Sequence, residues 1–98
     1  MAKIIWTDDA VSDLKEIIQF ISFEFERQAA RVGDKLIKRV DVLSEFVRIG
    51  RVVPEFEREN LRELIEQPYR IIYELKSEEE LWIIRIHHSA RLLKSILT

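Results

Sequence analysis

The two histidines of the chain are adjacent, in the stretch RIHHSAR at residues 85–91. Histidine is a common metal ligand, but neighbouring strand residues point to opposite faces of a sheet, so His87 and His88 are poorly placed to hold one ion together. The chain has no cysteine and no histidine pair spaced i, i+4. Glycine-rich phosphate loops and a nucleophile elbow around Ser89 are also missing. We therefore expect no metal site and no cofactor.

A second polar group is formed by Glu55, Arg70, His88 and Arg91. Arg70 and His88 flank a predicted tight hairpin, so they should lie near each other in space. A plain surface role remains an alternative for both, because charged strand residues are usually solvated and strand-end histidines are often hydrogen-bonded rim residues. His87, which alternates with other strand residues, is expected to be exposed and without a role.

The register of the hairpin decides whether Arg70 and His88 share a face. One register pairs Arg70 with His88, and a register one residue away pairs Tyr69 with His88 and Arg70 with His87. The first gives the better active site and the second the better core, and the sequence leaves both open. The second register would gather on one side Tyr69, Ile71, Tyr73, Trp82, Ile84 and Ile86.

Two helices precede the hairpin. A short strand, KIIW at residues 3–6, is followed by Thr7 as N-cap, with acidic residues in the first turn. An apolar stripe at helical spacing runs from Ala10 to Phe25, and a second runs from Ala29 to Val47 and ends at Gly50, which we expect to be a left-handed C-terminal cap. The two helices should pack as an antiparallel hairpin.

The C-terminal half is rich in β-branched and aromatic residues. Residues 51–60 are expected to be an irregular connection, residues 61–67 are a possible strand, and residues 69–75 and 81–88 form a hairpin around the turn KSEEE. Residues 89–98 could add one or two helical turns. The predicted fold is α+β, in the order β-α-α-β-β-β: a four-stranded antiparallel sheet with the helical hairpin on one face and a short C-terminal helix.

Size and charge limit the function. Ninety-eight residues suit a single domain covering residues 1–98. We expect a cytoplasmic protein, because no signal peptide or apolar stretch of membrane-spanning length is present. The net charge of −2 and the pI of about 5.7 disfavour a general nucleic-acid binder, whose affinity depends on a basic surface. A local basic patch remains open.

The order of several motifs resembles a known family. IIWTDDAVSDLKEI, GRVVPE, YRIIYEL and IRIHHSARLL are similar, over nearly the whole chain, to the RelE/ParE superfamily of bacterial type II toxin–antitoxin systems. The likeness is greatest to its ParE, or plasmid stabilisation, branch. The resemblance implies a small α+β toxin that a cognate antitoxin silences. We expect an amphipathic helix and an extended tail of that antitoxin to lie across the helical hairpin and the sheet.

The resemblance implies one of two activities. RelE-like members are ribosome-dependent endoribonucleases of messenger RNA, in which Glu55 would be the base, Arg70 the charge clamp and His88 the acid. ParE-like members poison DNA gyrase and are not known as enzymes; Arg70, His88 and Arg91, with Arg62, would then be fold or binding residues. The acidic pI favours the gyrase poison over a ribosome-docking nuclease. A non-toxic relative that only binds a partner is a third alternative.

Overall fold

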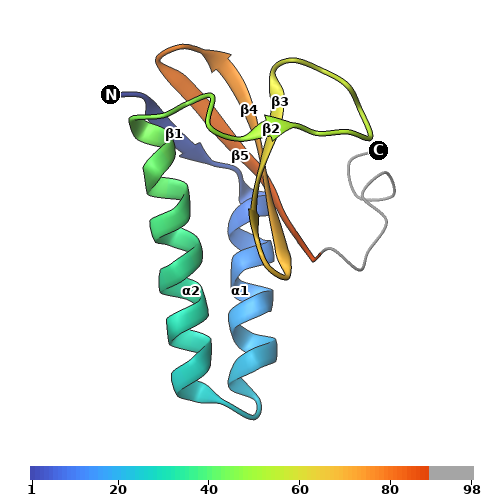
Figure 1. Ribbon diagram of the computed structural model, residues 1–98. Helices are drawn as coiled ribbons and strands as arrows, with labels where there is room; N and C mark the ends of the chain where they lie inside the picture. The colour runs from blue at the N-terminus through green and yellow to red at the C-terminus, as the bar shows by residue number, and fades with distance from the viewer. Residues whose placement is uncertain (89–98) are drawn as a thin grey trace.

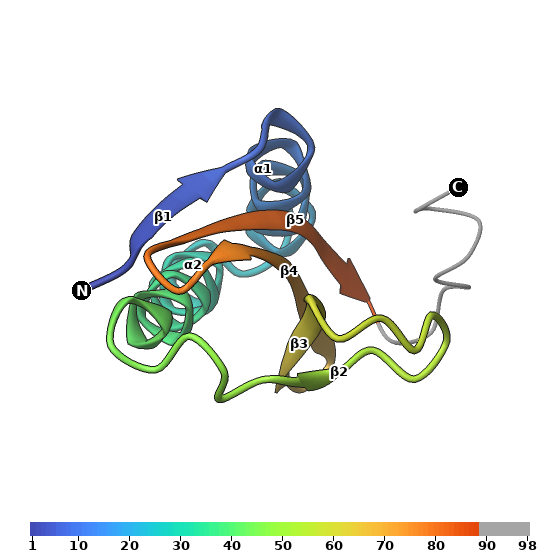
Figure 2. The ribbon, with the colours of Figure 1, turned by 90° about the horizontal axis from the view of Figure 1, so that it is seen from above.

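The computed structural model describes residues 1–88 and places their strands in one five-stranded sheet, with both helices packed on one face (Figures 1 and 2). The strand order is β1-β5-β4-β3-β2. The elements are β1 (Lys3–Trp6), α1 (Asp8–Ser22), α2 (Glu26–Asp41), the 3-10 turn η1 (Val42–Ser44), β2 (Arg51–Val52), β3 (Leu61–Glu66), β4 (Tyr69–Ser77) and β5 (Glu80–His88). The α+β fold predicted from the sequence is confirmed.

Helix α1 begins where the sequence predicts. The Thr7 hydroxyl oxygen accepts a hydrogen bond from the Ala10 N–H at 3.2 Å, and the same hydroxyl donates to the Ile83 carbonyl of β5 at 2.8 Å. Asp8 and Asp9 occupy the first turn, where the helix dipole stabilises negative charge. Thr7 therefore both caps the helix and fixes its start to the sheet.

Helix α2 ends earlier than predicted. It stops at Asp41, and the apolar residues that continue its stripe lie in η1 and the loop after it. The prediction that Gly50 is a left-handed cap is wrong, because neither glycine has a positive φ. Gly50 is required for another reason: a Cβ atom there would lie 2.6 Å from the Tyr73 hydroxyl oxygen and 2.7 Å from the Glu63 carbonyl oxygen.

The sheet differs from the prediction in two details. Strand β1 pairs with β5 in parallel, with Trp6 opposite Ile83. A parallel pair needs a long connection, and the helical hairpin together with the other strands supplies it. In addition, residues 51–52, expected to be irregular, form strand β2 antiparallel to β3. The sheet is therefore mixed and five-stranded among the described residues, where four antiparallel strands were expected.

A β-bulge in the β4–β5 hairpin decides which residues of β5 face the main core. Tyr69 is opposite His88 and Arg70 is opposite His87, but the register shifts after Ile72, so that Tyr73 is opposite Ile83. One of the two predicted registers is thus observed, but only at the open end of the hairpin. The shift reverses the alternation of β5. Ile83 and Leu81, rather than Ile84 and Trp82, face the main core.

Apolar clusters lie on both faces of the sheet. The larger packs between the helices and the sheet and includes Leu36, Val40, Ile71 and Tyr73. The smaller lies on the opposite face and contains Val53, Leu61 and Ile72, with Phe56 and Ile84 packed against it. The loop between β2 and β3 therefore covers part of the face that the helices leave open.

Candidate functional site

Five arginines around β2, β3 and β4 each contact at least one glutamate. We call this set the arginine–glutamate network. Its members are Arg48, Arg51, Arg58, Arg62 and Arg70, and Glu55, Glu59, Glu63, Glu74 and Glu78. Equal numbers of the two charges make the network neutral in sum. It contains three of the residues that the sequence proposed, Glu55, Arg62 and Arg70.

Arg70 is at the centre of the network. Its guanidinium donates two hydrogen bonds to the Glu55 carboxylate, at 2.7 and 2.9 Å, and its Nε donates to Glu63 Oε1 at 2.6 Å. Arg51 Nε donates to the other oxygen of Glu63, also at 2.6 Å. The Glu63 side chain is fully buried, at 0% exposure. Its charge is therefore balanced by two guanidinium groups and not by water.

These contacts change the ionisation of Glu55 and Arg70. The hydrogen bonds from Arg70 lower the pKa of Glu55 from 4.5 to about 2. Glu55 in turn raises the pKa of Arg70. Both groups are therefore charged across the neutral range, and the sequence was right to connect Glu55 with Arg70. It missed Glu63, whose only signal is its position two residues from both Leu61 and Ile65 in the strand LRELIE.

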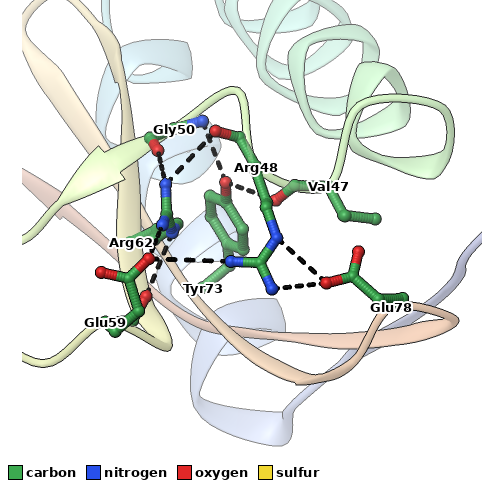
Figure 3. Close-up of polar contacts among 7 residues, drawn as sticks. All are labelled: Val47, Arg48, Gly50, Glu59, Arg62, Tyr73 and Glu78. Atoms are coloured by element: carbon green, nitrogen blue, oxygen red, sulfur yellow. Dashed lines mark hydrogen bonds and ion pairs between the residues drawn. The ribbon is translucent and has the colours of Figure 1, made fainter.

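Arg62 holds the loop before β2 in place (Figure 3). One terminal nitrogen donates to the Gly50 carbonyl at 3.0 Å and to the Arg48 carbonyl at 3.3 Å. Its Nε donates to the Glu59 carbonyl at 3.1 Å, and the guanidinium also contacts the Glu59 carboxylate. Arg62 thus donates hydrogen bonds to backbone carbonyls of two loops, so its role is structural.

Tyr73 supports the same loop from below in Figure 3. Its hydroxyl oxygen accepts from the Gly50 N–H at 3.0 Å and its hydroxyl donates to the Val47 carbonyl at 2.8 Å. Burial raises the pKa of this phenol. Tyr73 and Arg62 therefore together hold this loop against the sheet, although the loop lies outside the helices and strands.

The structure contradicts the prediction for one of the two histidines. His87, expected to be exposed, is buried, at 1% exposure. The prediction treated its face of the sheet as open to solvent, whereas that face carries the smaller apolar cluster. His88 is exposed, and its ring meets that of Tyr69 edge to face, with 5.7 Å between the ring centroids.

The observed register separates Arg70 from His88. Arg70 is paired with His87, while His88 is paired with Tyr69, so Arg70 and His88 point to opposite faces of the sheet. His88 faces a hollow of about 500 Å³ beside helix α1. The structure thus brings Glu55 and Arg70 together and leaves His88 apart from them. Arg91 and the predicted C-terminal helix lie outside the described residues.

Asp13 is a buried polar residue that the sequence reasoning overlooked. Its carboxylate accepts from Arg85 Nε at 2.7 Å, from Arg85 Nη2 at 2.8 Å and from the Ile86 N–H at 2.9 Å. It therefore ties α1 to β5 immediately after the bulge. The available signal was its position, three residues after Ala10 and four before Ile17, within the apolar stripe of α1.

Residues 1–88 contain neither a cluster of metal-ligand side chains nor a helix that could cross a membrane. Within this range, no three histidine, aspartate or glutamate side chains are grouped so as to hold a metal ion. Neither of the helices in this part of the chain combines the length and apolar character that crossing a bilayer requires.

Comparisons with known proteins give a matching family model, a sequence relative and a similar fold. Residues 4–93 match the family described as "ParE toxin of type II toxin-antitoxin system, parDE". The chain is 33% identical over 92 residues to "Toxin RelE2" of Caulobacter vibrioides, a match that covers 94% of this chain and all of the relative. A solved structure, "Chromosomal ParDE TA system from P. aeruginosa", is 24% identical with a TM-score of 0.75, over 90% of this chain and 96% of that chain, and shows the same fold.

Proposed function

Because the chain belongs to the ParE toxin family of type II toxin–antitoxin systems, we propose that it inhibits growth by poisoning DNA gyrase. Membership makes it a toxin of the ParE/RelE superfamily and implies an antitoxin partner. The choice of gyrase as target is our proposal, as is action in the cytoplasm, where gyrase meets DNA.

The observation that carries this proposal is the register of the β4–β5 hairpin. A nuclease built from Glu55, Arg70 and His88 needs all three around one phosphodiester. In the observed register Arg70 is opposite His87, and His88 belongs to the other face of the sheet. A proton donor on the far face cannot serve a phosphate held by Arg70, because proton transfer needs hydrogen-bonding distance. This geometry supports the non-enzymatic class.

The electrostatics of Glu55 support the same choice. A general base works best when its pKa is near the operating pH. The pKa of Glu55 is about 2, and both of its carboxylate oxygens accept hydrogen bonds from Arg70. Such a carboxylate is a weak base at neutral pH. Arg70 is likewise already bound to two carboxylates, which leaves little of its charge for a phosphate.

The whole-molecule charge is a further argument. The chain has a net charge of −2, and the arginines of the network are balanced by an equal number of glutamates. Docking to the ribosome depends on basic surface that releases counterions from RNA phosphates. In the gyrase reading, Arg62 and Arg70 act through the fold, while the exposed His88, together with Arg91, remains a candidate contact residue.

A ribosome-dependent endoribonuclease is the second candidate. It is favoured by the direct contact between Glu55 and Arg70 and by the similarity to a relative that carries the name RelE2. A relative that binds its antitoxin without being toxic is the third candidate, and the growth measurement below tests it.

One experiment with two arms tests the proposal. The chain is first induced alone, and arrested growth is expected. Purified protein is then assayed for gyrase-dependent DNA cleavage and, separately, for messenger RNA cleavage on ribosomes. We expect activity in the gyrase arm only, and we expect Glu55→Ala and His88→Ala to retain at least part of it.

The control and the contrary result are defined in the same assay. Glu57→Ala removes one exposed negative charge from the same loop and controls for the change in net charge. Ribosomal cleavage that Glu55→Ala and His88→Ala abolish, and that Glu57→Ala preserves, would overturn the gyrase proposal in favour of the nuclease. Normal growth on induction would favour the third candidate.

A further inference from the structure

Helix α2 carries a row of basic side chains opposite its buried side. The buried positions of the helix are Ala29, Gly33, Leu36 and Val40. Four exposed basic residues, spaced by four, four and three positions, share the other side of the helix, because residues three and four apart lie on one face. We call them the basic row, and they are Arg27, Arg31, Lys35 and Lys38. Asp34 is the only acidic residue between the two ends of the row.

Most of the cations on α2 have no carboxylate partner. Six lysines and arginines of the described range 1–88 form no ion pair within that range, and four of the six belong to α2. Lys35 does have a partner, Glu66, at 4.0 Å, but its side chain is 66% exposed. Helix α2 has five basic and three acidic residues, a net charge of +2, whereas the whole chain has −2. Positive charge is therefore concentrated on this helix.

The stability of the helix does not explain the first half of the row. Lys38 lies in the last turn, where the helix dipole stabilises a positive charge. Arg27, in contrast, lies in the first turn, where the dipole disfavours it. Arg31 follows one turn later and forms no ion pair with a described residue. Two arginines thus stand exposed where they do not help the helix, which favours a role in binding a negatively charged partner.

The shape of the row fits a linear polyanion. Eleven residues separate Arg27 from Lys38, a distance of about 16 Å along the helix axis. Each strand of duplex DNA carries one phosphate per about 3.4 Å of its axis, so the row matches about five successive phosphates. Helix α2 contains no aromatic residue on which an unpaired base could stack. Its first turns also extend beyond the strands at the bottom of Figure 1, where the sheet does not obstruct a long partner.

We propose that the basic row contacts the phosphate backbone of the duplex DNA on which gyrase acts. The inference rests on the proposed function for the source of that duplex. Phosphate contacts carry no sequence information, so the contact is independent of DNA sequence. Four cations on a chain of net charge −2 bind DNA weakly by themselves. Gyrase, by holding both the toxin and the DNA, raises the effective concentration of one for the other.

The salt dependence of DNA binding tests the row directly. A fluorescently labelled duplex is titrated with the full chain, and anisotropy is measured from about 50 mM salt upwards. Four phosphate contacts predict a slope of about −3.6 for the logarithm of the binding constant against that of the salt concentration. Arg27→Gln with Arg31→Gln should weaken binding at low salt by at least about tenfold and reduce the slope to about −1.8. Arg27→Lys with Arg31→Lys should preserve both values.

A matched pair of substitutions controls for net charge. Lys3→Gln with Arg58→Gln removes the same two positive charges from exposed positions outside α2, in β1 and in the loop between β2 and β3. This pair should bind the duplex as the unaltered chain does. In the gyrase assay, the Arg27 and Arg31 glutamine pair should require more toxin for half-maximal DNA cleavage, and the control pair should not. Circular dichroism confirms that each variant is folded.

Four results would overturn the inference. They are no binding of the duplex at about 50 mM salt, an equal loss in the control pair, tighter binding of a polyglutamate peptide, which would indicate an acidic protein as partner, and tighter binding of duplex RNA.

The gyrase arm separates this inference from the proposed function. Cleavage that is equal for the unaltered chain and the Arg27 and Arg31 glutamine pair would reject the role of the row and leave gyrase as the target. No cleavage by the unaltered chain, with duplex binding that depends on the row, would reject gyrase as the source of the duplex and support the DNA contact alone.

Discussion

Replacing Glu63 by glutamine tests whether the arginine–glutamate network stabilises the fold. Removing one partner of a buried ion pair costs about 3–5 kcal/mol. Two features reduce this here: Arg51 is exposed and regains water, and Arg70 keeps its two hydrogen bonds to Glu55. We therefore expect the free energy of unfolding to fall by about 2–3 kcal/mol. With an unfolding entropy of about 2.1 cal/mol/K per residue over 98 residues, the melting temperature should fall by about 10–15 °C.

The assay is thermal and urea unfolding followed by circular dichroism. Glu59→Gln is the matched control, because Glu59 also contacts two arginines but its side chain is 76% exposed. Exposed ion pairs contribute about 0–1 kcal/mol, so this variant should lose no more than about 5 °C. If the two variants lose the same stability, the buried position of Glu63 has no special effect and the reasoning is refuted.

Three further perturbations follow from the contacts. Tyr73→Phe removes the hydroxyl that accepts from the Gly50 N–H, and should lower the urea-derived stability by about 1–2 kcal/mol; an unchanged value would mean that water replaces it. Asp13→Ala removes the carboxylate that accepts from Arg85 and from the Ile86 N–H, and should lower the free energy of unfolding by about 2–3 kcal/mol in calorimetry; Asp13→Asn should lose less. Because the folded-state pKa of Glu55 is about 2, against 4.5 ordinarily, its stabilisation relative to Glu55→Gln should be full above about pH 4.5 and disappear towards pH 2. A pH-independent difference in urea unfolding would contradict this.

Local signals in the sequence were sufficient for the helical hairpin and for the start of α1. Thr7 followed by two aspartates predicts a capped helix, and the observed cap bond from the Ala10 N–H confirms it. Period-two strands around a polar turn likewise predicted the β4–β5 hairpin. These signals are local, because a cap or an alternation depends on neighbours within a few residues.

The features that the sequence missed depend on contacts between distant segments. The apolar stripe after Asp41 is the same in a helix or in a loop that packs on the core, and only the bonds from Tyr73 and Arg62 decide for the loop. The bulge opposite Ile72 reverses the faces of β5 without any local mark. The burial of His87 and the exposure of His88 also depend on which distant segments cover each face of the sheet, so the sequence could not predict them.

The distribution of satisfied and unsatisfied charge separates a structural region from a recognition region. A carboxylate that is already bound to a guanidinium gains little from a new partner, because the old contact must be broken first. This applies to Glu55 and Glu63, whose arginines also fix the loops around β2. Glu16 and Glu24 have no such contact to lose within the described residues, and they border exposed phenylalanines. Substitutions in the network should therefore change the stability of the fold more than they change affinity for a partner.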